Sequence, residues 1–262
     1  MISTIRPRIK ALIIDFDGVL WRDQEAIGCL PDIFAAIQAN GWRFVFATNN
    51  SMHTPEHYQE KLEKFGVSID NPIIITSSMA VANVLKRELP DGGAVHAVGE
   101  TGLRTVLQNA GFTLRDEEVL AVVAGLDRNF TFEKLNRAAR LIRNGAIFYG
   151  TNPDKTFPTP NGLTPGAGSI LAALEAASGV APIIVGKPLP ALFQFALEML
   201  HTLPQETLVI GDRLDTDILG GQRTGMRTAL VLSGVSKPEE LQHWQPKPDL
   251  VAVDLAEIVT PP

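Results

Sequence analysis

The chain has 262 residues, of which 45% are hydrophobic and 20% charged, a composition typical of a globular protein with one large domain or two smaller ones. The net charge of −6 with no basic block argues against nucleic acid as a partner, and the single cysteine, Cys29, excludes an intrachain disulfide and is expected to be a small apolar filler. Because the chain lacks both a signal-peptide core and an apolar run of about 18 residues, we expect a cytoplasmic protein that does not enter a membrane.

Short apolar runs alternate with amphipathic stretches along the chain, which predicts a parallel sheet flanked by helices. The first part is expected to form strands 9–14, 43–47 and 73–75 with helices 31–40 and 54–65. The middle is expected to form helix 78–88, strand 94–98, helix 100–109, strand 119–124, helix 131–143, strand 146–149, a loop over 151–168 and helix 169–178. The last part is expected to form strand 183–185, helix 189–200, strand 207–210, helix 216–224 and strands 228–232 and 249–253.

Residue types that carry chemistry are confined to two parts of the chain, 15–51 and 186–217. The block between them is almost free of such residues, although it repeats the same alternation of strands and helices. We therefore predict an α/β core formed by residues 1–77 and 180–262, interrupted by an inserted α/β domain over 78–179.

Two carboxylates follow the first apolar run directly. Asp15 and Asp17 belong to an Asp-Phe-Asp-Gly sequence at the expected carboxyl end of a buried strand, where open α/β sheets bind ligands. Residues i and i+2 of an extended chain point the same way, and Gly18 permits a sharp turn. Two such acids indicate a cation, a shared proton or a catalytic role, and Mg²⁺ suits carboxylates combined with phosphate oxygens. A solvated loop with aspartate turns is the alternative.

Two later strand ends carry groups that suit an anion. Thr48, Asn49 and Asn50 follow the apolar run 44–47, and their hydroxyl and amide groups can donate hydrogen bonds to phosphate. Lys187 lies between a glycine and a proline, where it would offer a fixed positive charge to an anionic substrate or to crowded carboxylates. Taken singly, these segments are also consistent with turn chemistry and with a solvated lysine.

The strand expected at 207–210 is followed by acids again. Asp212 comes after a single glycine, and Asp217 lies near the start of the next expected helix. Asp212 is therefore a candidate cation ligand. Asp217 can cap backbone N–H groups or orient its neighbours.

In their order along the chain, these segments resemble the haloacid dehalogenase superfamily of aspartate-nucleophile phosphatases. The sequences Asp-Phe-Asp-Gly-Val-Leu-Trp at 15–21, Thr-Asn-Asn-Ser at 48–51 and Gly-Lys-Pro at 186–188 are similar to its NagD-type branch, also called the 4-nitrophenylphosphatase-like branch. The resemblance implies a Rossmann-like, doubly wound parallel sheet with an inserted α/β cap domain, and it allows a homodimer built through the cap.

The resemblance also implies roles for individual residues. Asp15 would be the nucleophile that forms an aspartyl-phosphate, and Asp17 the general acid and base. The side chains expected to hold the phosphoryl oxygens are Thr48, Asn49, Asn50 and Lys187. The expected Mg²⁺ ligands are Asp15, the backbone carbonyl of Asp17, and Asp212, with Asp217 orienting the loop or a metal-bound water.

The expected function is Mg²⁺-dependent hydrolysis of a small phosphorylated metabolite. The cap would choose the leaving group, and its candidate residues are Asp127, Asn152 and Asp154, which are also ordinary turn and hinge residues. The alternative is a phosphate-binding or phospho-accepting regulatory module with little turnover, although Asp17 beside Asp15 favours turnover. Phosphoglycolate, pyridoxal phosphate, sugar phosphates and nucleoside monophosphates all remain open as substrates.

Overall fold

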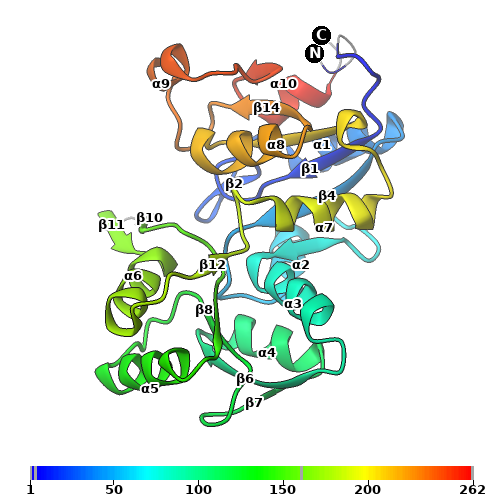
Figure 1. Cartoon of the computed structure of the whole chain (residues 1–262). Helices are drawn as coiled ribbons and strands as arrows, with labels where there is room; N and C mark the ends of the chain where they lie inside the picture. The colour runs from blue at the N-terminus through cyan, green and yellow to red at the C-terminus, as the bar shows by residue number, and fades with distance from the viewer. Residues whose placement is uncertain (1, 3–4, 160–161, 261–262) are drawn as a thin grey trace. The chain divides into compact units, whose positions relative to one another are not determined.

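In the computed structural model, which describes residues 2, 5–159 and 162–260, the chain forms two α/β units (Figure 1). The first unit comprises Met1–Thr48, Glu56–Ile75 and Lys187–Pro262, and the second comprises Asn49–Pro55 and Thr76–Gly186. Both units contain a parallel sheet with helices, so the predicted α/β class is confirmed. The sequence predicts domain boundaries at 77/78 and 179/180, whereas the compact units divide at 75/76 and 186/187, and residues 49–55 also belong to the second unit.

A six-stranded sheet forms the centre of the first unit, in the order β15-β14-β13-β1-β4-β5. Its strands are β1 (Ala11–Ile14), β4 (Arg43–Thr48), β5 (Ile74–Thr76), β13 (Thr207–Gly211), β14 (Arg227–Val231) and β15 (Leu250–Ala252). β1 runs parallel to both of its neighbours, pairing Ile14 with Ile210 of β13 and with Phe46 of β4. All four residues of β1 are buried, as expected for a parallel strand covered on both faces.

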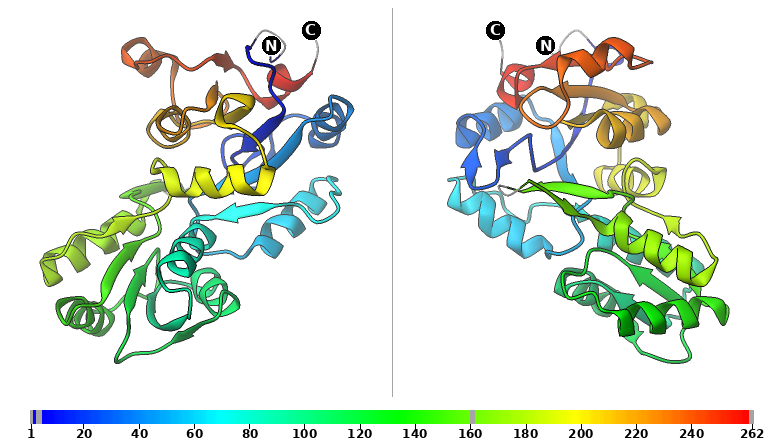
Figure 2. Two further views of the ribbon diagram at one scale, coloured as in Figure 1. Left: turned by 45° about the vertical axis from the view of Figure 1, so that its right-hand side comes forward. Right: turned by 90° about the vertical axis from the view of Figure 1, so that its left-hand side faces the viewer.

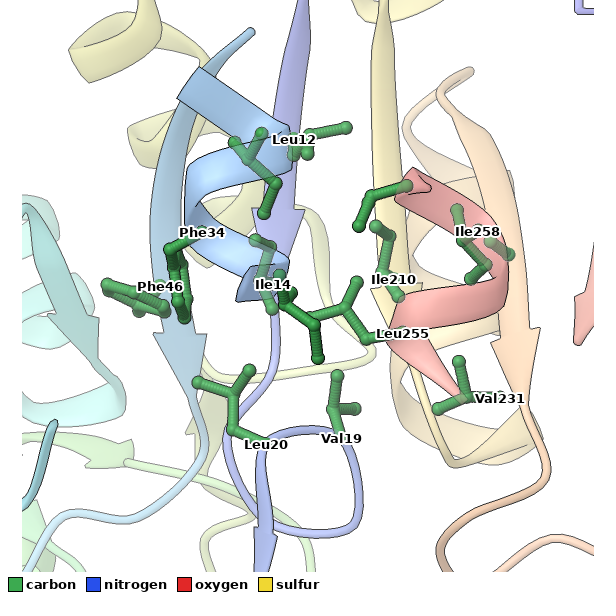
Figure 3. Close-up of a cluster of buried hydrophobic side chains, with 14 of the residues drawn as sticks. Leu12, Ile14, Val19, Leu20, Phe34, Phe46, Ile210, Val231, Leu255 and Ile258 are labelled. Carbon is green, nitrogen blue, oxygen red and sulfur yellow. The ribbon is translucent and has the colours of Figure 1, made fainter. Parts of the chain in front are cut away.

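The two faces of this sheet bury alternate residues of each strand. On one face, Leu12, Ile14 and Ile210 pack against helices α1 (Leu30–Ala39) and α10 (Leu255–Val259) in one hydrophobic cluster (Figure 3). On the other face, Val209 lies against α8 (Leu219–Arg223), where a Cβ on Gly221 would come within 3.1 Å of its side chain. Helix α7 (Pro190–Leu200) packs against α8.

The second unit contains a five-stranded parallel sheet, in the order β12-β9-β8-β6-β7. Its strands are β6 (Gly93–Val98), β7 (Phe112–Leu114), β8 (Ala121–Ala124), β9 (Ile147–Gly150) and β12 (Ile183–Ile184). Helices α5 (Phe132–Arg143) and α6 (Ala167–Ser178) pack side by side on one face, over Val122, Ala124 and Phe148 (Figure 2). Tyr149 points to the opposite face, where its hydroxyl donates to Glu88 at the end of α3 (Ser77–Glu88). Helix α4 (Thr101–Asn109) packs against α3.

The structure corrects the sequence prediction in several short elements. The sequence predicts strand 183–185 as part of the core, but β12 pairs with β9 and belongs to the sheet of the second unit. The expected loop over 151–168 contains an antiparallel pair, β10 (Thr156–Thr159) and β11 (Gly162–Pro165); residues 160 and 161 of that loop lie outside the described residues. Cys29 is exposed, so it does not fill an apolar gap.

Other elements were not predicted at all. These are β2 (Trp21–Arg22), β3 (Glu25–Ala26), β7, α9 (Pro238–His243) and α10. The expected helix 54–65 is α2 (Pro55–Lys64). The helix expected over 216–224 begins earlier, as the π-helical turn η3 (Leu214–Ile218), and continues as α8. Within the described residues, none of the helices has both the length and the apolar character needed to span a membrane.

Candidate active site

The carboxyl ends of three adjacent strands in the first unit bring the predicted residues together. Asp15 follows β1 directly, Thr48 is the last residue of β4, and Asp212 follows β13. Because β1 lies between β4 and β13, the order of strands along the chain reverses at this point of the sheet. Such a switch point is where open α/β sheets bind their ligands.

Lys187 links two of the acids at this edge. Its ammonium group lies 2.8 Å from Asp15 Oδ1 and 2.7 Å from Asp217 Oδ1, and the residue is only 3% exposed. Burial alone would lower the pKa of Lys187, but the carboxylates of Asp15 and Asp217 outweigh it and raise that pKa. The lysine is therefore a fixed positive charge between the partly buried Asp15 and the buried Asp217.

One lysine does not neutralise the whole acidic group. Oxygen atoms of Asp15, Asp212 and Asp217 all lie within 4.8 Å of one another. Burial raises the pKa of Asp15 well above its ordinary value, opposed by Lys187 and reinforced by Asp217 and Asp212. Burial, together with the negative charge of Asp217, raises the pKa of Asp212 to about 7. These shifts express the cost of crowding like charges away from water, and a bound cation would relieve that cost.

The acidic group suits a divalent metal ion. Three carboxylates supply the hard oxygen ligands that Mg²⁺ prefers, so Asp15, Asp212 and Asp217 could together hold such an ion. The sequence had assigned Asp217 to the surroundings of the metal, whereas the structure puts its carboxylate inside the cluster, bonded to Lys187.

Asp17 is oriented differently from Asp15. It is exposed, and its carboxylate lies outside the cluster of three acids. Its Oδ1 accepts a hydrogen bond of 2.8 Å from the indole N–H of Trp21. Asp17 is thus the more accessible carboxylate of the pair.

The loop that follows β14 also shapes the site, and sequence reasoning missed it. The backbone N–H of Val235 donates to Asp212 Oδ2 at 2.7 Å, and the Ser233 hydroxyl donates to the carbonyl of Gly18 at 2.6 Å. A Cβ on Gly234 would lie 1.9 Å from Asp212 Oδ2, so only glycine fits there. The Ser-Gly pair directly after an apolar strand was the available sequence signal.

The remaining predicted residues belong to the second unit and make contacts there. The side-chain amides of Asn49 and Asn152 both donate to Asp154 Oδ2, at 3.0 and 2.7 Å. Asn50 Oδ1 accepts from the backbone N–H of Met52 at 2.8 Å, which is the hydrogen bond of an Asx turn. The structure therefore brings Asn49, Asn152 and Asp154 into one polar group.

Asp127 is separate from that polar group. One of its carboxylate oxygens accepts from the backbone N–H of Asn129 at 2.9 Å, and the other from Lys134 Nζ at 2.6 Å. Both oxygens thus stabilise the turn that leads into α5.

The chain is similar in sequence to known hydrolases, among them two phosphatases. Residues 12–113 match the family model of haloacid dehalogenase-like hydrolases, and residues 184–258 match a model of HAD-hydrolase-like proteins. The chain is 37% identical to dihydroxyacetone phosphatase of Corynebacterium glutamicum over 94% of this chain and 89% of that protein. It is also 37% identical to acid sugar phosphatase of Staphylococcus aureus, over 95% and 96% of the two chains. The solved structure of NagD from E. coli superposes with a TM-score of 0.89 at 34% identity, covering 95% of this chain and 98% of that one.

Proposed function

Because the chain belongs to the haloacid dehalogenase-like hydrolases and is a phosphatase of their NagD-type branch, we propose that it hydrolyses the phosphate monoester of a small sugar through an aspartyl-phosphate on Asp15, with Mg²⁺ as cofactor. The observation that carries the proposal is the contact of the buried Lys187 with Asp15 beside Asp212 and Asp217.

In the first step, a carboxylate oxygen of Asp15 attacks phosphorus while the bond from phosphorus to the leaving oxygen breaks. Asp17 transfers its proton to that oxygen, so the alcohol departs neutral. In the second step, Asp17 takes a proton from water as the water oxygen attacks phosphorus. The acyl-phosphate bond breaks, and inorganic phosphate and free Asp15 result.

Charge control in this scheme comes from named groups of the chain. Lys187 neutralises part of the charge of Asp15, so a phosphate dianion can approach the nucleophile. Thr48, 4% exposed at the end of β4, together with Asn49 and Asn50, would hold the phosphoryl oxygens. Mg²⁺ held by the acidic cluster would supply further positive charge beside the phosphoryl group. This matters because phosphoryl transfer depends chiefly on positioning and charge stabilisation.

The proposal is tested by phosphate release from 4-nitrophenyl phosphate with Mg²⁺ and with EDTA. Turnover is expected only with Mg²⁺, and Asp15→Asn is expected to abolish it. Asp215→Asn is the matched control, because Asp215 is exposed and pairs with Arg213. Metal-independent turnover, or full activity in Asp15→Asn, would refute the mechanism. A stable phosphorylated Asp15 without hydrolysis would instead support a phospho-accepting module.

A small sugar phosphate is the proposed substrate class because two relatives that are 37% identical to this chain are named dihydroxyacetone phosphatase and acid sugar phosphatase. Asn152 and Asp154 are the proposed residues of the cap that select the leaving group, since their hydrogen-bonded pair can contact hydroxyl groups. The test is a panel of dihydroxyacetone phosphate, hexose phosphates, phosphoglycolate, pyridoxal phosphate and nucleoside monophosphates, compared by kcat/KM. Preference for a non-sugar ester would overturn the substrate class while leaving the phosphatase function intact.

A further inference from the structure

Trp21 makes a contact to which the mechanism above gives no role. Its indole N–H donates to Asp17 Oδ1 at 2.8 Å, and the residue is fully buried although Asp17 is exposed. We propose that Trp21 is a positioning residue, which holds the Asp17 carboxylate in the orientation from which it protonates the leaving group. The inference rests on the phosphatase function proposed above.

The indole ring cannot easily change its direction. It stacks on Phe16 with ring centres 4.9 Å apart and planes inclined by 13°. It also stacks on Phe65, with ring centres 5.8 Å apart. The ammonium group of Lys61 lies 4.3 Å from its centre, a cation–π contact that adds a further constraint. The N–H bond is therefore fixed in space by neighbours on several sides.

The backbone between the two residues is fixed as well. The Gly18 N–H donates to the Trp21 carbonyl, and the Leu20 N–H donates to the Phe16 carbonyl, both at 2.8 Å. The side-chain bond from Trp21 to Asp17 closes the same turn. A buried indole N–H without an acceptor would lose its hydration uncompensated, so the fold itself favours the carboxylate orientation that satisfies it.

This arrangement has a chemical consequence for proton transfer. The indole N–H occupies a lone pair of Oδ1, which leaves Oδ2 as the oxygen that carries the transferable proton. General acid catalysis contributes about 10²–10⁴-fold when the acid is well placed. A loosely held acid loses part of that factor, and it loses most on substrates whose leaving oxygen is basic. A nitrophenolate leaves readily without a proton, so it depends little on the acid.

The test is therefore the dependence of kcat/KM on the leaving group. Trp21→Phe keeps an aromatic ring against Phe16 but removes the N–H. Turnover of 4-nitrophenyl, phenyl and 4-methoxyphenyl phosphate is measured for wild type, Trp21→Phe and Asp17→Asn. kcat/KM reports the steps up to departure of the leaving group, so slow hydrolysis of the aspartyl-phosphate does not mask the effect.

We expect Trp21→Phe to lose less than about threefold on the nitrophenyl ester and about 10–100-fold on the methoxyphenyl ester. Asp17→Asn should show the steepest dependence on the leaving group. Trp244→Phe is the matched control, because its indole N–H donates to the amide oxygen Gln222 Oε1 at 3.3 Å and not to an acid, and it should behave as wild type.

An equal loss of kcat/KM on all three esters would overturn the positioning role, as would no loss. If kcat/KM of Asp17→Asn depends on the leaving group no more than kcat/KM of wild type does, Asp17 is not the general acid, and the inference about Trp21 fails too. A wild-type protein that hydrolyses none of the esters refutes the proposed function itself, which is a different result.

A second measurement does not require a folded Trp21→Phe variant. The chain has three tryptophans, so Trp42→Phe and Trp244→Phe identify the indole ¹⁵N–H signal of Trp21 by elimination. Asp17→Asn should shift that signal, whereas the control Asp215→Asn should leave it in place. A signal of Trp21 that is unmoved by Asp17→Asn would also overturn the inference.

Discussion

Replacement of Lys187 by methionine tests the electrostatic balance of the site most directly. The lysine pairs with Asp15 at 2.8 Å and Asp217 at 2.7 Å and is 3% exposed. Methionine keeps much of the volume but leaves the acids without their counter-ion. Removal of one partner from a buried ion pair costs about 3–5 kcal/mol, because the remaining charge is uncompensated. We therefore expect the first unit to lose about that much stability in the absence of a metal.

The assay is urea unfolding in EDTA followed by tryptophan fluorescence. All three tryptophans, Trp21, Trp42 and Trp244, belong to the first unit, so their fluorescence reports its unfolding selectively. Lys10→Met is the matched control: Lys10 pairs with Glu206 but is 54% exposed on its side chain, and such a pair is worth at most about 1 kcal/mol. Equal effects of the two substitutions would refute the argument. Mg²⁺ should restore part of the stability that Lys187→Met loses.

Two further predictions concern Gly18 and His96. In Gly18→Ala, the new Cβ would lie 2.3 Å from Asp212 Oδ2, whereas in Gly41→Ala it would meet nothing within 4 Å; both glycines have positive φ, 79° and 68°. We therefore expect phosphatase activity to fall at least about tenfold in Gly18→Ala and to stay unchanged in Gly41→Ala. Equal activities of the two variants would contradict this. Burial lowers the pKa of His96, although the Arg115 carbonyl and Asp116 oppose the shift. The unfolded chain then binds more protons than the folded one, so stability should fall as the pH drops below about 6.5. His96→Gln should show a smaller fall in unfolding followed by circular dichroism, and identical pH dependences would exclude the effect.

The sequence predicts every strand of the two large sheets except β7, because parallel strands buried on both faces are continuous apolar runs, as in β1. It also located Asp15, Lys187 and Asp212, since each follows such a run. It missed β2 and β3, which have two residues each and carry no recognisable periodicity. Short elements of this kind are stabilised by their neighbours and not by their own pattern.

Contacts between distant residues could not be predicted from one sequence. Asp217 looked like a helix cap, and only the folded chain shows that Lys187 joins it to Asp15. The bond between Trp21 and Asp17 spans four residues, yet its direction depends on the stack with Phe16. The amide of Asn49 was assigned to phosphate, and its contact with Asp154 depends on the fold of the second unit.

The position of β1 in the centre of its sheet has a consequence for synthesis on the ribosome. Lys187 follows Asp15 by 172 residues, and β13, the second neighbour of β1, begins only at Thr207. At about 5–20 residues per second, the nascent chain waits roughly 10–35 s between Asp15 and its counter-ion. During that interval one edge of β1 has no partner strand, which is a hazard for aggregation. A nascent chain of 186 residues contains the whole sequence of the second unit but only part of the first, so the inserted unit is the one that can finish folding first.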